Sequence, residues 1–236
     1  MNPILLQLRD VEKDYRGLRP LRIRALDVRH GESVALLGFD QITAELFVNL
    51  VTGAVTPDAG VVRAFGQSTS EITDADVWLA SLDRFGILSE RAVLLDQLTV
   101  AQNLAVPFTL ELAPIPDPVM ANVRRLSGEV GIHGGELERL VATVTPSVRA
   151  RVRLARALAL DPLILLAEHP NAAVPADDVA GFAADLSRAI ATRRIASVTL
   201  TADRTFAEAI AEHVLTLQPA TGELKARAGW RSWLGR

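Results

Sequence analysis

Short apolar runs alternate along the chain with longer stretches of helical periodicity. Residues 33–37 and 163–167 are almost continuously apolar, which is typical of strands buried on both faces of a sheet. Residues 149–160 and 177–191 repeat their apolar positions with the spacing of amphipathic helices. Further strands are expected at residues 197–201 and 214–217. Strands that alternate with helices indicate an α/β fold with a mostly parallel sheet covered on both faces.

Two regions depart from this alternation. Residues 4–8 and 21–25 carry the partial alternation of half-buried strands, which predicts an antiparallel β region at the N-terminus. Residues 100–142 are mainly helical in pattern but are interrupted by prolines, which predicts a smaller helical lobe. We therefore expect a single domain over residues 1–236, made of a core sheet lobe (1–87 and 150–225), a helical lobe (88–149) and a tail (226–236).

The segment between the strand at 33–37 and a helix expected at 44–50 is the first candidate site. The strand ends at Gly38, and glycine adopts backbone angles that other residues adopt poorly. A strand–loop–helix order is the geometry in which a helix N-terminus binds phosphate. The pattern therefore predicts the position of a phosphate-binding loop.

Composition narrows the classes of function. Of 236 residues, 49% are apolar, which suffices for a sizeable core and argues against disorder. The net charge of -3 argues against a nucleic-acid partner, which usually requires a basic excess. The absence of cysteine excludes disulfides and thiolate metal sites. Neither a signal peptide nor a run of roughly 18 apolar residues is visible, so we expect a soluble, cytoplasmic protein.

A further set of motifs occurs in order along the chain: Val11-Glu12-Lys13-Asp14-Tyr15, Gly31-Glu32, Thr52-Gly53, Pro57-Asp58-Ala59-Gly60, LTVAQN at 98–103, RVRLARALALDP at 151–162, and Pro170. In this order and spacing, the chain resembles ABC-type ATPase domains over residues 4–225. The nearest resemblance is to the short exporter-type subunits of lipoprotein-release and macrolide-export systems. The resemblance implies a P-loop NTPase-like ABC ATPase fold.

The family's phosphate loop reads G-x-x-G-x-G-K-S/T, and this chain departs from it at nearly every position. The aligned residues are Gly38, Phe39, Asp40, Gln41, Ile42, Thr43, Ala44 and Glu45. Ala44 stands where a lysine would reach the phosphates, and Glu45 where a hydroxyl would bind magnesium. A carboxylate about 4 Å from a phosphate charge costs roughly 4 kcal/mol at an effective dielectric constant of about 20. We therefore expect no cofactor and no metal, unless Glu45 itself holds an ion.

The other family positions are altered as well. Glu168 takes the place of the metal-binding aspartate and His169 that of the catalytic glutamate; they either assist a metal ion and a water molecule or are remnants at a buried strand end. Ala202 replaces the histidine that would contact the γ-phosphate, and Glu90 the glutamine that links metal and permease. Tyr15 is kept, either as an adenine platform or as a structural residue.

The signature motif of the family, L-S-G-G-Q, is equally degenerate. It aligns with Val144, Thr145, Pro146, Ser147 and Val148. Thr145 could replace the serine hydroxyl, but Pro146 has no N–H to donate and Ser147 restricts the backbone. We expect a helix that begins here but caps a partner's nucleotide poorly.

Together these substitutions predict a catalytically inactive pseudo-ATPase, docked on an integral membrane permease as a structural or regulatory subunit, at the inner face of the cell membrane. It would form a homodimer or a heterodimer with another ABC ATPase. The alternatives are an atypical active ATPase that uses Glu45, Glu168 and His169, and a stand-alone binding module. The resemblance implies a permease contact at Leu88, Ser89, Glu90, Arg91, Leu98 and Asn103.

Two features lie outside these motifs. Trp230 and Trp233 have helical i,i+3 spacing among basic residues, so they either bind a membrane surface or a partner groove or pack back on the domain. Asp177 and Asp178 follow Pro175, and we interpret them as acidic residues that open a helix and interact with its dipole rather than as a metal site.

Overall fold

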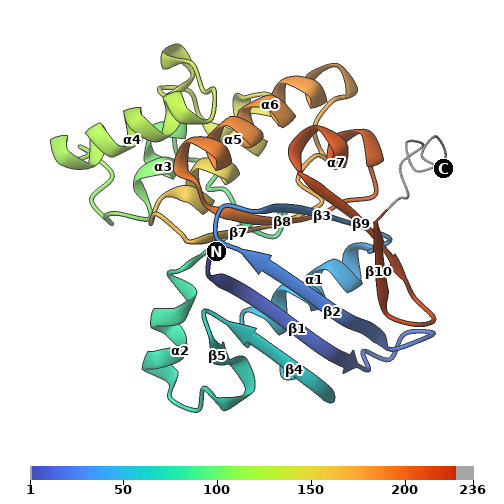
Figure 1. The fold of residues 1–236 in the computed structure, drawn as a ribbon. Helices are drawn as coiled ribbons and strands as arrows, with labels where there is room; N and C mark the ends of the chain where they lie inside the picture. The colour runs from blue at the N-terminus through green and yellow to red at the C-terminus, as the bar shows by residue number, and fades with distance from the viewer. Residues whose placement is uncertain (1, 227–236) are drawn as a thin grey trace.

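The computed structural model of the chain describes residues 2–226, which form two sheets with flanking helices (Figure 1). One sheet has the strand order β2-β1-β4-β5 and the other the order β10-β9-β3-β8-β7-β6. The strands are β1 (Ile4–Lys13), β2 (Leu21–Arg29), β3 (Ser33–Leu37), β4 (Ala59–Ala64), β5 (Gln67–Ser68), β6 (Phe85–Leu88), β7 (Ile164–Glu168), β8 (Ala196–Leu200), β9 (His213–Gln218) and β10 (Glu223–Ala226). The helices are α1 (Gln41–Val51), α2 (Ala75–Leu82), α3 (Val100–Ala105), α4 (Asp117–Glu129), α5 (Pro146–Leu158), α6 (Ala176–Arg193) and α7 (Arg204–Ile210), with 3₁₀ turns η1 (Thr69–Glu71), η2 (Gly134–Glu136) and η3 (Val141–Thr143).

The larger sheet is parallel except at its β10 edge. β3 lies between β8 and β9 and runs parallel to both, and β7 runs parallel to β6 and β8. β10 pairs with β9 in the antiparallel direction, and the smaller sheet is antiparallel throughout. The predicted combination of a mostly parallel core sheet and an antiparallel N-terminal region is confirmed. Because parallel strands share a direction, the carboxyl ends of β3, β7 and β8 lie at one edge.

Helix α1 is packed between the two sheets (Figure 1). Its residues Phe47 and Leu50 belong to the same apolar cluster as Leu8 of β1 and Leu166 of β7. A second cluster joins α3, α4, α5 and α6 to the opposite face of the parallel sheet, with Phe182 of α6 fully buried in it. The candidate phosphate loop therefore leads into a helix that is held on two sides.

Two helices begin earlier than their apolar periodicity predicts. α1 begins at Gln41 instead of residue 44, and α5 begins at Pro146 instead of residue 149. In both cases a polar side chain caps the helix ahead of its apolar face, Asp40 in α1 and Thr145 in α5. The short elements α2, α7, β6 and β10 were not expected from the pattern.

The predicted helical lobe consists of the helix α4 and the short elements α3, η2 and η3, beside α5 and α6 (Figure 1). Its boundary with the core lobe stays a prediction. Within residues 2–226, none of the helices combines the length and the apolar character that a membrane crossing requires. Of the predicted tail, Ala226 ends β10, whereas Trp230 and Trp233 lie outside the described residues.

Candidate functional site

The loop after β3 comprises only residues 38–40. Gly38 has a φ of +90°, a left-handed angle that suits glycine, and Phe39 is buried. Residues 41–43, which the resemblance places in an open phosphate loop, form the first turn of α1. The strand–loop–helix order is as predicted, but the loop is shorter than expected.

The chain's own carboxylate caps the amino end of α1. Asp40 Oδ1 accepts hydrogen bonds from Thr43 N at 2.8 Å and from Thr43 Oγ1 at 2.6 Å, and Asp40 N donates to Thr43 Oγ1 at 2.9 Å. The N–H of Ala44 donates to the Asp40 carbonyl at 2.9 Å. Hydrogen bonds from Thr43, chiefly from its hydroxyl, lower the pKa of Asp40. The Asp40 carboxylate thus accepts the Thr43 N–H at the positive end of this helix.

We expect the Asp40→Ala variant to lose about 1 kcal/mol of the free energy of unfolding at neutral pH, a typical N-cap contribution. Because folding lowers the pKa of Asp40, the charge-dependent part of this stabilisation is fully present above the unfolded pKa of about 3.9 and is lost as the pH falls through the folded pKa. Denaturant titrations across this acidic range test it. Asp40→Asn is the control, because asparagine caps a helix but does not titrate. Equal midpoints for the Asp40→Ala variant and the unmodified chain at neutral pH would contradict the cap.

The side chains of Ala44 and Glu45 lie on different faces of α1. Ala44 is fully buried in the apolar cluster between the two sheets. The Glu45 side chain is half-exposed, and its Oε1 lies 3.0 Å from Nη1 of Arg91. The position aligned with the phosphate-binding lysine therefore lies in the core, and the position aligned with the magnesium-binding hydroxyl carries an ion pair.

Arg91 also pairs with Glu168, the last residue of β7. Arg91 Nε donates to Glu168 Oε2 at 3.1 Å, and Arg91 Nη2 donates to Oε1. Ser89 Oγ donates to Oε2 at 2.7 Å. The hydrogen bond to Glu168 raises the pKa of Arg91, which stays charged. Sequence reasoning assigned Arg91 only to a permease contact, whereas the structure places it at the centre of the candidate site.

His169 follows Glu168 in a strained conformation. Its φ of +42° is uncommon for a residue other than glycine, and its main-chain N–H donates to Leu200 O at 2.8 Å. Within residues 2–226, Nε2 of His169 is a buried nitrogen without a hydrogen-bond partner. Left-handed angles outside glycine cost about 1–3 kcal/mol and often mark functional positions. The ring therefore retains an unused polar atom at the position aligned with the catalytic glutamate.

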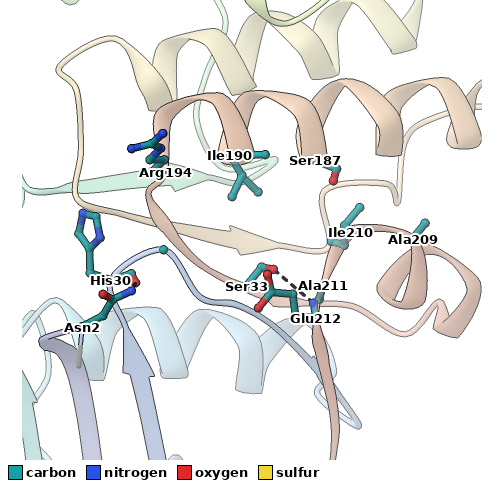
Figure 2. Close-up of a pocket in the computed structure, with 12 residues that line it drawn as sticks. Asn2, His30, Ser33, Ser187, Ile190, Arg194, Ala209, Ile210, Ala211 and Glu212 are labelled. Atoms are coloured by element: carbon teal, nitrogen blue, oxygen red, sulfur yellow. Dashed lines mark hydrogen bonds between the residues drawn. The ribbon is translucent and has the colours of Figure 1, made fainter.

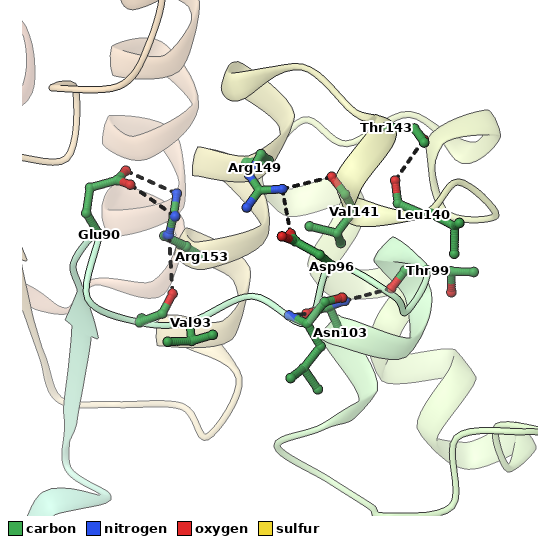
Figure 3. A network of polar contacts seen from close by, with 12 residues as sticks. Glu90, Val93, Asp96, Thr99, Asn103, Leu140, Val141, Thr143, Arg149 and Arg153 are labelled. Atoms are coloured by element: carbon green, nitrogen blue, oxygen red, sulfur yellow. Dashed lines mark hydrogen bonds and ion pairs between the residues drawn. The ribbon is translucent and has the colours of Figure 1, made fainter.

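Glu90 is directed away from Glu168. Its carboxylate forms an ion pair with Arg153 of α5, with Oε2 at 3.0 Å from Nη2 (Figure 3). The Arg153 side chain is largely buried against the segment 89–96. Glu90 thus connects the segment to α5, and Arg91, the next residue, connects it to β7.

Two further arginines of α5 bind the same segment. Arg149 Nη1 lies 2.8 Å from Asp96 Oδ1 (Figure 3), and Arg156 Nη1 donates to Val93 O at 2.7 Å. The backbone is held in this way while the Val93 side chain remains 72% exposed. The segment is therefore fixed on its inner side and apolar on its outer side.

Several residues of the implied permease contact are unavailable to a partner. Leu88, Ser89 and Asn103 are buried, and Leu98 is half-buried. Asn103 bonds to the backbone of neighbouring residues, with its Nδ2 donating to a carbonyl at 3.0 Å. The permease contact itself stays a prediction; of its residues Glu90 and Arg91 are exposed, and further exposed residues lie beside them. Those with apolar side chains are Val93, Leu95 and Leu140.

The signature-like segment begins α5, as expected, but its serine lies inside. Thr145 Oγ1 accepts from Val148 N at 3.3 Å, and Pro146 occupies the first turn. Ser147 is buried, and its Oγ donates to Asp178 of α6. Val144, like Val148, is also buried. The segment presents an amino end of α5 that Thr145 already caps.

The acidic pair after Pro175 lies where predicted. Asp177 and Asp178 occupy the first turn of α6, which confirms the helix-opening interpretation. Among the described residues, no three or more His, Asp or Glu side chains are grouped so as to hold a metal ion. Asp178 has a role that the sequence did not reveal, as the partner of Ser147.

Tyr15 lines a hollow of about 420 Å³ together with Arg19, Gly38 and Asp40. The ring is half-buried, and it lies so close to Gly17 that an added Cβ there would be 2.5 Å from Tyr15 Cε2. The chain thus packs part of its own loop on the tyrosine. The hollow joins the predicted adenine and phosphate positions, and the described residues that line it include Arg19 and Arg22 but no lysine.

Ala202, at the histidine position of the family, is exposed just after β8. The next residue, Asp203, caps α7 by accepting a hydrogen bond from Phe206 N at 3.0 Å. Asp203 also accepts from Asn171 Nδ2 at 3.1 Å. Both of these contacts are structural.

A larger hollow, of about 690 Å³, lies at the opposite end of the parallel strands (Figure 2). Its lining includes Ser33 at the start of β3 and Arg194 just before β8, with His30 and Glu212. None of the predicted site residues lines it. Size therefore does not identify the site in this fold.

Comparisons with known proteins find relatives along most of the chain, although no protein-family model matches it. The phosphonates import ATP-binding protein PhnC of Anaeromyxobacter dehalogenans is 33% identical over 198 residues, covering 80% of this chain and 39% of that protein. The lipoprotein-releasing system ATP-binding protein LolD of Chromohalobacter salexigens is 29% identical over 174 residues, covering 72% of this chain and 73% of LolD. The sulfate/thiosulfate import ATP-binding protein CysA of Pseudomonas aeruginosa is 27% identical, covering 90% of this chain and 63% of CysA. The chain thus spans less than two thirds of PhnC and of CysA.

Solved structures share the fold. The dimeric ATP-binding cassette MJ0796, in a post-hydrolysis state bound to ADP and Pi, matches with a TM-score of 0.77 at 21% identity, over 96% of this chain and 100% of that chain. CbiO1 of Clostridium perfringens, part of the ABC transporter complex cbiONQ, matches with a TM-score of 0.79 at 16% identity, over 95% of this chain and 88% of that chain. The resemblance seen in the motifs, including its LolD-like character, agrees with these matches. In sequence the chain is similar to ABC ATP-binding subunits, and in structure it has the fold of the ABC ATPase cassettes.

Proposed function

We propose that this chain is a nucleotide-binding-domain-like subunit of an ABC transporter that does not hydrolyse ATP and serves as a structural or regulatory component on a membrane permease. The observation that carries the proposal is the ion-pair cluster of Glu45, Arg91 and Glu168. The two carboxylates aligned with the magnesium-binding positions of the family are both engaged by one guanidinium. The family's metal ion therefore does not fit the site as it stands.

The amino end of α1 supports the same conclusion. A triphosphate bound there would compete with the Asp40 carboxylate for the Thr43 N–H. The Asp40 carboxylate would in addition repel a phosphate about 4 Å away by roughly 4 kcal/mol at an effective dielectric constant of about 20. With Ala44 buried, no side chain at the lysine position offsets this repulsion.

The docking half of the proposal rests on the family and on an exposed apolar surface. Related proteins are named for import and lipoprotein-releasing systems. Val93, Leu95 and Leu140 expose apolar side chains, and Leu140 bridges to Thr99 at the start of α3. We propose this surface as the permease contact, which places the protein at the cytoplasmic face of a membrane.

A second cassette completes the proposed assembly. MJ0796 forms a dimer in its solved structure. A homodimer of this chain would place the capped end of α1 opposite the Thr145-capped end of α5, so that neither shared site would hold a nucleotide. A heterodimer with an intact ATPase would leave hydrolysis to the partner's own residues. Nucleic acid is not part of the proposal.

One observation favours a second candidate, an atypical active ATPase. Nε2 of His169 has no partner among residues 2–226, and it lies at the position aligned with the catalytic glutamate. In that case Glu168 would have to exchange Arg91 for a metal ion. ATP turnover by the purified assembly that is lost in the His169→Ala variant would establish this candidate instead.

The test is an ATP titration of the purified chain with and without Mg²⁺, with an intact LolD protein as the positive control. We expect no saturable binding and no effect of Mg²⁺, because the anion and cation positions are occupied by Asp40 and Arg91. Saturable Mg²⁺-dependent binding would overturn the non-hydrolysing assignment. When the protein is instead isolated from membranes, we expect a permease to copurify with it and to crosslink to position 93. Purification without any membrane protein would favour a stand-alone module.

A further inference from the structure

We infer that Arg91 is a built-in cation, taking the place between Glu45 and Glu168 that a divalent ion takes in an ATP-binding cassette and tethering the segment 89–96 to the core without nucleotide. The inference rests on the proposed function and deepens it, because it names what holds the site together when no nucleotide is bound. It concerns this chain's own residues and is tested without ATP.

The geometry brings three distant parts of the chain to one point. Glu45 lies in α1, Glu168 ends β7, and Arg91 follows the last residues of β6 by a short loop. The guanidinium uses Nη1 for Glu45, at 3.0 Å, and Nε and Nη2 for Glu168, with Nε at 3.1 Å. A single planar cation thus binds one carboxylate in a fork and reaches a second one.

Burial makes the cation necessary. The Glu168 side chain is 0% exposed, whereas those of Arg91 and Glu45 are 41% and 42% exposed. A buried carboxylate without a cation is strongly disfavoured, and Ser89 supplies only a neutral hydrogen bond. An ionised Glu168 therefore requires a cation, either an arginine or a metal ion, and the chain supplies the arginine.

A divalent ion and the guanidinium exclude each other. Carboxylate oxygens are suitable ligands for Mg²⁺ and Mn²⁺, but both oxygens of Glu168 and Oε1 of Glu45 here contact the same arginine. The unmodified chain should therefore be indifferent to these ions. Removal of the guanidinium should leave two carboxylates close to one position and create an affinity for divalent cations that the unmodified chain lacks.

The experiment measures thermal unfolding of Arg91→Ala in EDTA and in millimolar MnCl₂. The matched control is Arg9→Ala, because Arg9 is 42% exposed and also contacts both oxygens of one carboxylate, with its Nη2 at 2.7 Å from each, but its partner Asp27 is 34% exposed. In EDTA we expect a fall in Tm of about 6–12 °C for Arg91→Ala and of less than about 4 °C for Arg9→Ala. MnCl₂ should raise the Tm of the Arg91→Ala variant and leave the unmodified chain and Arg9→Ala unchanged.

Two further variants keep the test decisive if Arg91→Ala does not fold. The double variant Arg91→Ala/Glu168→Gln should recover most of the lost Tm and lose the MnCl₂ response, because no buried charge is left unpaired. Arg91→Lys should lie between Arg91→Ala and the unmodified chain, since an ammonium lacks the fork. Hydrogen exchange of residues 89–96 should be faster in Arg91→Ala than in Arg9→Ala.

The inference is overturned if the Tm of Arg91→Ala in EDTA falls no further than that of Arg9→Ala. It is also overturned if MnCl₂ does not raise the Tm of Arg91→Ala, or if MnCl₂ raises the Tm of the unmodified chain by the same amount. These outcomes are separate from those of the ATP titration. Bound ATP would remove the proposed function even where Arg91→Ala behaves as expected. If Arg91→Ala behaves like the control, the inference fails, but the absence of ATP binding would still support the proposed function.

Discussion

The Ala44→Lys variant is expected to lose about 3–4 kcal/mol of the free energy of unfolding and to gain no affinity for ATP. Ala44 has no exposed surface and lies in the cluster between the two sheets, so a lysine there must overpack the core and bury an ammonium. In a phosphate loop of the family the same substitution would supply the residue that reaches the phosphates. Thermal unfolding and an ATP titration, run on one preparation, measure both effects.

The matched control is Ile42→Lys, which adds the same side chain to the same turn of α1 at a position that is 63% exposed. We expect its stability to stay within about 0.5 kcal/mol of the unmodified chain. If Ala44→Lys keeps the original Tm and binds ATP while Ile42→Lys does not, position 44 faces a competent phosphate site, and the capped geometry of α1 does not hold in solution.

The Arg193→Ala variant should lose about 3–5 kcal/mol, the cost of removing one partner from a buried ion pair. Arg193, at the end of α6, forms a two-point ion pair with Glu129 of α4, and both side chains are largely buried. Its Nη1 also donates to Leu158 O at 2.7 Å and to Asp161 Oδ1 at 2.9 Å. One side chain therefore joins α6 to α4 and to the end of α5. Among residues 2–226, its loss leaves Glu129 with only the weaker ion pair to Arg125.

Chemical denaturation with a probe on α4 and another on the core sheet tests this prediction. Arg188→Ala serves as the control, because Arg188 lies on the same helix and is 54% exposed, and its partner Asp185 keeps a second arginine, Arg151. We expect the control to cost no more than about 1 kcal/mol. A loss in Arg193→Ala no larger than that of the control would mean that apolar packing alone holds the lobe.

The parallel core was predictable because burial on both faces constrains sequence strongly. The run at 33–37 coincides with β3, and the run at 163–167 differs from β7 by one residue. The amphipathic pattern at 177–191 likewise lies within α6, which extends beyond it at both ends. In these elements the apolar side chains that define the pattern are the ones that form the core.

Helix starts were less predictable because polar side chains set them. The apolar face of α1 points to a start near residue 44, but Asp40 and Thr43 form a reciprocal cap that adds a turn in front of it. The D-x-x-T spacing was visible in the sequence. Read as a cap, it would have predicted that the loop is too short to enclose a phosphate.

Arg91 could not be located from the sequence because its partners are remote. Glu45 and Glu168 are 46 and 77 residues away along the chain, and only the tertiary fold brings them together. Alignment with the family directed attention to Glu90, which turns instead to Arg153. One signal was available in the charges. Glu45 and Glu168 both align with metal-binding positions of the family and together require a cation, and Arg91 directly follows Glu90, the position aligned with the family's glutamine.

Three of the four arginines of α5 have a mechanical consequence for the proposed subunit. Arg149, Arg153 and Arg156 bind side chains and backbone of the segment around Val93. The helix that carries them begins at Pro146, behind its Thr145 cap, at the end that we propose would face a second cassette. A partner that displaces Val93 would therefore move the segment 89–96 and α5 together as one rigid unit. Such a subunit would transmit movement between a permease and the second cassette as a rigid body, without hydrolysing ATP itself.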